Sequence, residues 1–88
     1  MLSALIEHYT NSGDHRDAVR TAREILELDP LNEEAHRWLM VAYARTGRTN
    51  YALRQYLECR RALVGELGVE PAASTSRLQA RILAGEAI

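Results

Sequence analysis

The sequence predicts an all-α fold in which antiparallel helix hairpins stack against one another. Two stretches of the chain carry the same residue pattern 34 residues apart. Leu5, Ile6, Tyr9, Gly13, Ala18 and Ile25 correspond to Leu39, Met40, Tyr43, Gly47, Ala52 and Cys59. A repeat of this length is typical of helix hairpins whose apolar faces are covered by neighbouring hairpins. Because such stacks present grooved surfaces to partners, the pattern favours protein contact over catalysis.

The composition agrees with one small globular domain. The chain has 88 residues, of which 47% are apolar and 26% are charged. No apolar run approaches the roughly 20 residues that span a bilayer. The first residues also lack the basic and apolar pattern of a secretory signal. We therefore expect a soluble, cytoplasmic protein that does not contact membranes.

The first hairpin is expected over residues 1–32. Its first helix runs from about Leu2 to Asn11, because apolar residues recur there with a helical period, and Ser12-Gly13 ends it. Asp14 is expected to cap a second helix, which Asp29-Pro30 terminates. The inner face of that helix is expected to contain Ala18, Val19, Ala22, Ile25 and Leu26, and Leu28 is expected to close the helix.

The second hairpin is expected over residues 33–68. Asn32 caps its first helix, and Gly47 ends that helix as Gly13 ends the first. The core stripe of this helix is expected to be His36, Leu39, Met40 and Tyr43, with Trp38, Val41 and Ala42 as a second stripe packed between helices. Thr49 is expected to cap the next helix, which reaches about Leu67 and carries Ala52, Leu53, Tyr56, Cys59, Leu63 and Val64.

The repeat breaks at the end of this fourth helix. The counterpart of Pro30 would fall at Val64, whereas the next proline is Pro71. The helix is therefore expected to run about two turns longer than its counterpart, since nothing stops it before Gly68. A C-terminal capping helix is expected over residues 73–84, with fraying beyond Leu83.

The residues of these segments resemble known families. Their spacing over residues 2–66 resembles the tetratricopeptide repeat, twice over. The segments 29–40 (DPLNEEAHRWLM), 42–48 (AYARTGR), 52–56 (ALRQY) and 67–71 (LGVEP) more specifically resemble the bacterial transcriptional activator domain. The resemblance implies a single domain over residues 1–88, with about five helices in a right-handed tetratricopeptide-like stack. It also implies a regulatory protein-interaction module of a transcriptional activator.

That family usually follows a winged-helix DNA-binding domain, whereas Met1 leads almost directly into a predicted helix. We therefore expect a fragment of a larger regulator or a stand-alone remnant. Its partners would be a protein or the neighbouring domains of the same regulator. The alternative is a general tetratricopeptide scaffold that binds a peptide or a partner protein outside transcription. Direct binding of DNA phosphates is a third hypothesis, which the net charge of −1 disfavours.

The inner groove of the stack is the predicted partner-binding surface. The first helix of each hairpin contributes its residues, Glu7, Asn11, Glu34, Arg37, Val41 and Arg45. Arg37 and Arg45 are expected either to bind an acidic peptide or to remain solvated or paired with the acidic first repeat. Val41 stands where carboxylate-clamping tetratricopeptide domains need a polar amide, so that subclass is not expected.

Charge is distributed unevenly along the chain. Residues 1–34 hold eight acids and three arginines, a net charge of −5, and residues 35–66 hold six arginines and two acids, a net charge of +4. Arg45, Arg48, Arg54, Arg60 and Arg61 form a basic cluster, within which Arg54 and Glu58 are spaced as a helical ion pair. This polarity predicts a contact with an acidic domain or a head-to-tail homo-oligomer that weakens as salt rises.

Residues with catalytic or metal-binding chemistry show no recognisable arrangement. His8, His15 and His36 lack partners at ligand spacing, and the single cysteine cannot complete a zinc site. No phosphate-binding loop or nucleophile motif is present in the sequence. We therefore expect no metal, no cofactor and no enzymatic activity, and a packing role for Cys59.

Overall fold

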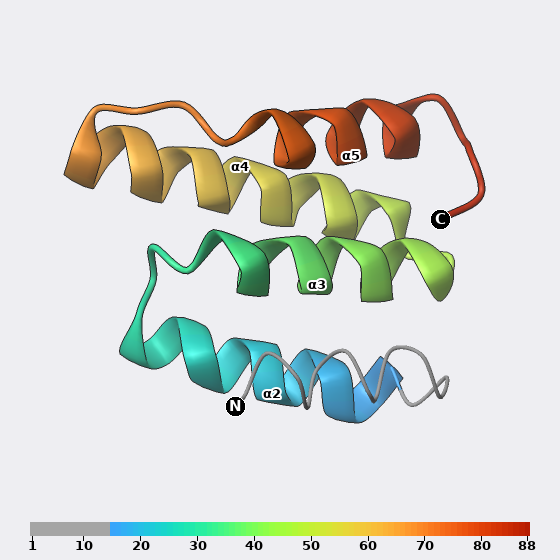
Figure 1. Ribbon diagram of the computed structural model, residues 1–88. Coiled ribbons are helices and arrows are strands. Elements are labelled where there is room, and N and C mark those ends of the chain that lie inside the picture. The colour runs from blue at the N-terminus through green and yellow to red at the C-terminus, as the bar shows by residue number, and fades with distance from the viewer. Residues whose placement is uncertain (1–14) are drawn as a thin grey trace.

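In the computed structural model, residues 15–88 of the chain are described, and they form four helices and no strand. These helices are α2 (His15–Leu28), α3 (Glu33–Arg45), α4 (Thr49–Leu67) and α5 (Ala73–Leu83). Successive helices run in opposite directions, as Figure 1 shows. The all-α prediction is thereby confirmed. The helix expected over residues 2–11, the Gly13 turn and the Asp14 cap lie outside the described residues.

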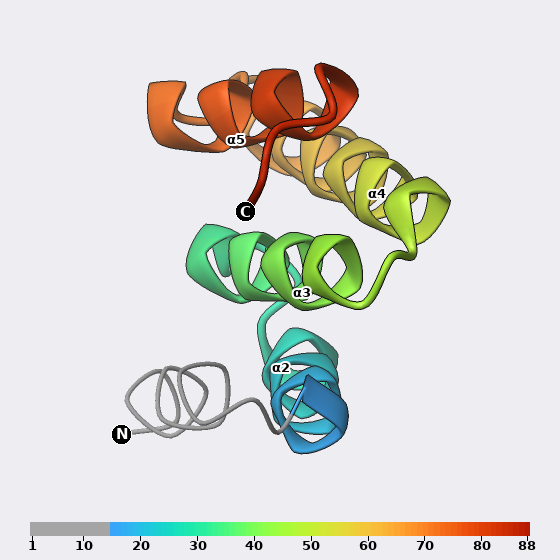
Figure 2. The ribbon, with the colours of Figure 1, turned by 90° about the vertical axis from the view of Figure 1, so that its right-hand side faces the viewer.

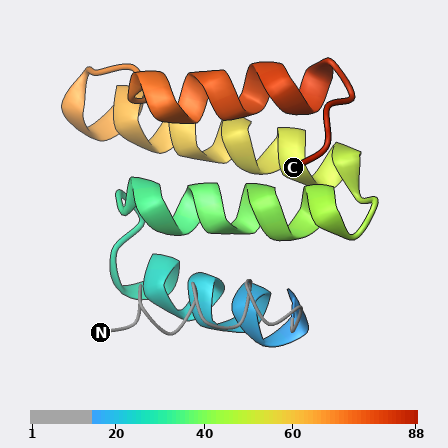
Figure 3. The ribbon, with the colours of Figure 1, turned by 45° about the vertical axis from the view of Figure 1, so that its right-hand side comes forward.

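The helices form a layered stack in the order of the chain. α3 packs against α2, α4 and α5, and α4 also packs against α5. Within the described part of the chain, α2 and α4 both contact α3 but do not pack against each other. The view along the helices shows α4 displaced to one side of α3 while α5 returns toward the other (Figure 2). Figure 3 shows the same order of layers from an intermediate side.

The core is centred on α3, as its two apolar stripes predicted. Leu39 and Met40 are completely buried there, and so are Ala22 of α2 and Ala52 of α4. Alanines at these positions let the neighbouring helices approach α3 closely, since a methyl group adds little thickness. The rest of the core cluster consists of Ala18, Ile25, Ala35, Tyr43, Leu78 and Ile82. Partly buried residues, including Val19, Leu26 and Trp38, pack around it.

The predicted helix boundaries agree with the structure except at the start of α4. The side chain of Asn32 accepts a hydrogen bond from Ala35 N at 3.0 Å, which confirms it as the cap of α3. Thr49 is not the cap of α4. That position belongs to Arg48, which makes no capping hydrogen bond with its side chain. The turn through Gly47, with φ of 76°, brings Arg48 N to within 2.8 Å of Tyr43 O, so α4 begins one residue earlier than expected.

The overlong fourth helix is confirmed. α4 has 19 residues against 14 in α2, and it ends at Gly68 in the left-handed conformation. Leu28 is the last residue of α2, as predicted, and is exposed. Val64, expected on the apolar face of α4, is nevertheless 39% exposed. Val64 follows the buried Leu63, and consecutive helical residues point about 100° apart.

The C-terminal residues differ from the expected frayed end. α5 stops at Leu83, one residue before the expected end, and Gly85 then reverses the chain with φ of 75°. Glu86 N donates to Arg81 O at 3.1 Å, and Arg45 Nη2 donates to Ile88 O at 3.2 Å. These hydrogen bonds hold residues 84–88 beside the end of α3, which is why the segment does not simply extend from the helix.

Candidate functional site

The described residues of the predicted inner groove lie along α3. Arg37 Nη1 donates to Thr75 Oγ1 of α5 at 2.9 Å, and Arg45 donates to the Ile88 carbonyl. Both arginines are therefore engaged by α5 and the residues that follow it, and neither forms an ion pair with the described residues of α2. This face of α3 is partly occupied within the chain itself.

The other residues of that predicted groove are placed differently. Glu34 is exposed and accepts a hydrogen bond from the Trp38 indole at 3.3 Å, while Val41 is partly buried against the core. Trp38 is itself part of the packing around the core, as predicted. Glu7 and Asn11 lie outside the described residues. Partner binding by this groove stays a prediction.

A buried polar cluster fixes the start of α5 on α3. Glu33 Oε2 accepts from Ala72 N at 2.7 Å and from the Thr75 hydroxyl, and Thr75 is completely buried. The same hydroxyl accepts from Arg37, whose guanidinium is 3.7 Å from Glu33. Ala72 has no side chain able to cap α5, so the carboxylate of Glu33 supplies the acceptor from another helix. Sequence reasoning missed this cluster because no local pattern connects these distant residues.

A second buried polar group joins α3 to α4. His36 Nε2 is 2.9 Å from Pro30 O, and His36 Nδ1 is 2.8 Å from Gln55 Nε2. A carbonyl only accepts and an amide nitrogen only donates, so in this arrangement Nε2 donates and Nδ1 accepts. Both ring nitrogens are used in structural hydrogen bonds. No group of three or more His, Cys, Asp or Glu side chains converges on a metal-sized site within residues 15–88.

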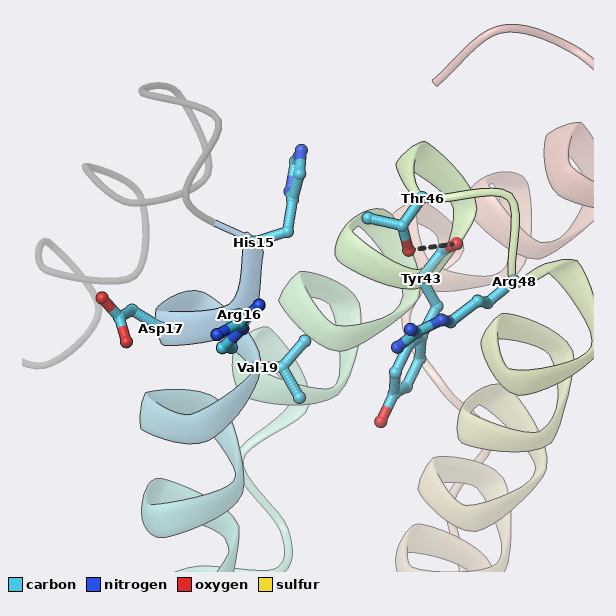
Figure 4. A pocket seen from close by; sticks show the side chains of 7 residues that line it. All are labelled: His15, Arg16, Asp17, Val19, Tyr43, Thr46 and Arg48. Atoms are coloured by element: carbon cyan, nitrogen blue, oxygen red, sulfur yellow. Dashed lines mark hydrogen bonds between the residues drawn. The ribbon is translucent and has the colours of Figure 1, made fainter.

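An open furrow separates α2 from α4, and we call it the α2–α4 furrow. Two hollows of about 670 and 320 Å³ lie along it, and Val19, Tyr43 and Arg48 line both. The larger hollow is also lined by His15, Arg16, Asp17 and Thr46, and the smaller by Arg23, Tyr51, Arg54, Gln55 and Glu58. Figure 4 shows Tyr43 and Arg48 projecting into the space that faces Val19, whereas Asp17 points away. Sequence reasoning did not predict this furrow.

Two tyrosines lie between two arginines across the furrow from α2 to α4. The Arg23 guanidinium donates to the Tyr43 hydroxyl and lies 5.8 Å from the centre of that ring. The Tyr43 and Tyr51 ring centres are 5.6 Å apart, and Arg54 lies 5.5 Å from the Tyr51 ring centre. Arg23 is thus held at the hydroxyl edge of Tyr43, and Arg54 lies within cation–π distance of the Tyr51 ring.

The arginines of the furrow form no ion pair with a described residue, a property that they share with Arg61 and Arg77. Arg20 pairs with Asp17 at 2.7 Å and Arg60 pairs with Glu70 at 2.8 Å. By contrast, the structure shows no ion pair for Arg23, Arg48 or Arg54 within residues 15–88. The predicted Arg54–Glu58 pair is wrong, because Arg54 lies over Tyr51 and Glu58 instead accepts from Gln55 at 3.2 Å. The furrow therefore carries positive charge that the described residues leave unneutralised.

Cys59 has a structural role in the core of α4. It is completely buried, and burial raises the pKa of its thiol to about 11. The negative charge of Glu33 raises this pKa further, and Arg37 acts in the opposite direction. The thiol is thus protonated near neutral pH, a form that is a poor nucleophile and a poor metal ligand.

No described helix combines the length and apolar character needed to cross a membrane.

Known proteins similar to this chain are bacterial regulators. Regulatory protein AfsR of Streptomyces griseus is 42% identical over 71 residues, which cover 81% of this chain and 7% of AfsR. Regulatory protein DnrI of Streptomyces peucetius is 35% identical over 83 residues, which cover 94% of this chain and 30% of DnrI. The chain thus spans less than a third of these relatives.

A solved structure has a similar fold. A solved structure of Mycobacterium tuberculosis EmbR in complex with a low-affinity phosphopeptide superposes with a TM-score of 0.92 at 23% identity. The superposition covers 98% of this chain and 23% of EmbR. The family model of the bacterial transcriptional activator domain matches residues 1–83. This family is one of transcriptional regulators and not of enzymes, and the chain described here belongs to it.

Proposed function

We propose that the chain is a protein-interaction module of a bacterial transcriptional regulator, and that the α2–α4 furrow is its contact surface. The observation that carries the proposal is the row of Arg23, Tyr43, Tyr51 and Arg54 across the furrow. Arginine and tyrosine are enriched among residues that dominate protein interfaces, because they bury large area and form directed hydrogen bonds. The part of this row on α4 is accessible, since Tyr51 is 48% exposed.

The comparisons support a role as one part of a larger regulator. Relatives such as AfsR and DnrI are much longer than the segment they share with this chain. EmbR, which has the same fold over this segment, is known in complex with a phosphopeptide, and a protein segment is thus a plausible kind of partner here as well. In this proposal the domain transmits a protein contact to other parts of the regulator. DNA recognition is left to those other parts.

A reporter experiment tests this role. The chain is fused to an unrelated DNA-binding protein whose operator controls a reporter gene in a Streptomyces host. We expect the fusion to raise reporter output, and the double variant Tyr51→Ala, Arg54→Gln to return it to the level of the DNA-binding protein alone. Arg77→Gln, an exposed residue of α5, is the control and is expected to leave the output unchanged. Equal output from the furrow variant and the parent fusion would contradict the proposal.

A further inference from the structure

We infer that the α2–α4 furrow binds an extended acidic segment of a partner protein, whose carboxylates pair with Arg23, Arg48 and Arg54. This inference rests on the proposed function, to which it adds the chemistry of the partner. Three features of the furrow support it: its shape, the contacts of its arginines, and the acidic residues that interrupt its positive charge.

The furrow has the shape of a linear site. The two hollows described above share Val19 and Arg48. The smaller of them shares Arg23 and Glu58 with a third hollow, and the third shares Leu26 with a fourth. On α2 this path extends from His15 to Leu26, which at the helical rise is about 16 Å. An extended chain of about five residues spans that distance. The side chains of alternate residues would then face the furrow floor.

The arginines are prepared to bind carboxylates. Arg23 is held by the Tyr43 hydroxyl and ring, and Arg54 is held by the Tyr51 ring. A guanidinium group fixed in this way loses little further entropy when its N–H edge pairs with a carboxylate. Arg48 lines both hollows and forms no ion pair with a described residue. Three such groups along one furrow are complementary to several carboxylates in sequence.

The remaining lining residues favour a protein segment over a nucleic-acid backbone. Glu58 lines the same hollow as Arg23 and Arg54, and Glu27 lines the next hollow, so the positive charge of the furrow is interrupted. A phosphate backbone carries negative charge at regular short intervals and would meet these carboxylates. A protein segment avoids this repulsion by placing neutral residues there. Val19 and Leu26 also offer apolar contacts to such residues.

Fluorescence anisotropy of the intact chain tests this inference. The probe is a labelled peptide of about ten residues in which Glu alternates with Ala, since alternation places carboxylates on one side of an extended chain. We expect the peptide to bind at low salt and its Gln-for-Glu analogue not to bind. The double variant Arg23→Gln, Arg54→Gln is expected to weaken binding at least about tenfold. The control Arg60→Gln, Arg77→Gln removes the same charge outside the furrow and is expected to change affinity by less than about twofold.

Several results would overturn the inference. One is equal weakening in both double variants, which would indicate an unspecific response to net charge. Another is tighter binding of duplex DNA than of the acidic peptide with the same dependence on Arg23 and Arg54, which would identify phosphates as the ligand. A third is failure of the peptide to bind the folded parent chain. The reporter experiment separates the two proposals. If reporter output depends on the furrow but the acidic peptide does not bind, only the inferred chemistry of the partner is wrong.

Discussion

Cys59 shows how one residue in the core makes stability depend on pH. Its thiol has a pKa of about 11 in the folded chain against an ordinary value of 9.0. Between these values the folded state retains a proton that the unfolded chain has lost. The free energy of unfolding contributed by this thiol is therefore complete below about pH 9 and decreases as pH rises toward 11.

We expect Cys59→Ala to remove that part of the pH dependence. In urea unfolding, the free energy of unfolding of the parent chain should fall by about 2 kcal/mol more than that of the variant between pH 7 and pH 11, since each pKa unit corresponds to about 1.4 kcal/mol. Comparing the two proteins cancels the ionisation of tyrosines common to both. Parallel pH profiles for the parent and the variant would show that the thiol has an ordinary pKa in the folded state.

His36 and Gln55 form a buried polar pair in which each side chain satisfies a hydrogen-bonding group of the other. Both are almost completely buried, and each supplies what the other lacks: a ring nitrogen that accepts and an amide that donates. The His36 ring also ties the Pro30 carbonyl to α3. A buried polar group left without its partner costs more than the hydrogen bond contributes. The pair thereby restricts α3 and α4 to one register.

At the scale of elements, the end of α4 depends on one glycine. Gly68 has φ of 66°, a conformation that costs a residue with a side chain about 1 kcal/mol or more. Gly65, three residues earlier, lies inside α4, and an added methyl group would meet nothing within 4 Å at either position. The two glycines thus differ in backbone conformation and not in available space.

This difference predicts opposite signs for the same substitution. Gly68→Ala is expected to lower the free energy of unfolding by about 1 kcal/mol. Gly65→Ala is expected to raise it by up to about 1 kcal/mol, because alanine is the better residue inside a helix. Urea unfolding of the two variants beside the parent chain measures both. A loss of stability in Gly65→Ala would mean that the interior of α4 is constrained by something other than helix propensity.

The attachment of α5 depends on the buried cluster of Glu33, Arg37 and Thr75. Thr75→Val keeps the shape of the side chain but removes the hydroxyl that joins the carboxylate to the guanidinium. We expect a loss of about 1 to 3 kcal/mol, because two partly buried charged groups lose a partner. Amide hydrogen exchange should show faster exchange in α5 than in α2, since only α5 is held by this cluster.

Thr49→Val is the matched control for this experiment. Thr49 is exposed at the start of α4, and its side chain does not cap that helix. The same loss of a hydroxyl group there is expected to change stability by less than about 0.5 kcal/mol. A Thr75→Val variant with unchanged exchange in α5 would indicate that Leu78 and Ile82 hold the helix by themselves.

At the scale of the whole molecule, the sequence was sufficient to predict the four helices that the structure describes over residues 15–88. The apolar periods of α2 and α3, the Asn32 cap and the late stop at Gly68 are local signals, and local signals determine where helices begin and end. The overlong α4 also distinguished this family from other helical repeats. The error at Thr49 arose because the preceding turn, and not the capping preference of a side chain, sets the first residue of α4.

The candidate site was harder to predict because it is assembled across three helices. In the row from Arg23 through Tyr43 and Tyr51 to Arg54, only Tyr51 and Arg54 are related by a helical period, and the steps between helices have no local signal. The basic cluster was visible in the sequence, but its members separate in the structure. Arg60 is neutralised by Glu70, whereas Arg48 and Arg54 line the furrow. Such differences depend on which carboxylates the fold brings near, and charge counts along the chain do not contain that information.

The uneven charge of the chain leads to a prediction about its association. Arg37 and Arg60 already pair with Glu33 and Glu70, so the structure reduces the free positive charge available for a head-to-tail contact. Arg48 and Arg54 are among the arginines that form no ion pair with a described residue, and both line the furrow. A contact between copies is therefore expected to be weak and to use the furrow as its basic side.

Sedimentation velocity at high protein concentration measures this association. We expect a concentration-dependent increase in the sedimentation coefficient at about 0.01 M salt, where charges act over about 30 Å, and its loss at about 0.5 M salt, where they are screened within a few ångströms. Arg48→Gln with Arg54→Gln should abolish the increase, because these side chains supply the free positive charge of the furrow. Arg77→Gln with Arg81→Gln, on α5, should preserve it. A chain that stays monomeric at low salt would exclude the head-to-tail contact and leave the furrow to a different acidic partner.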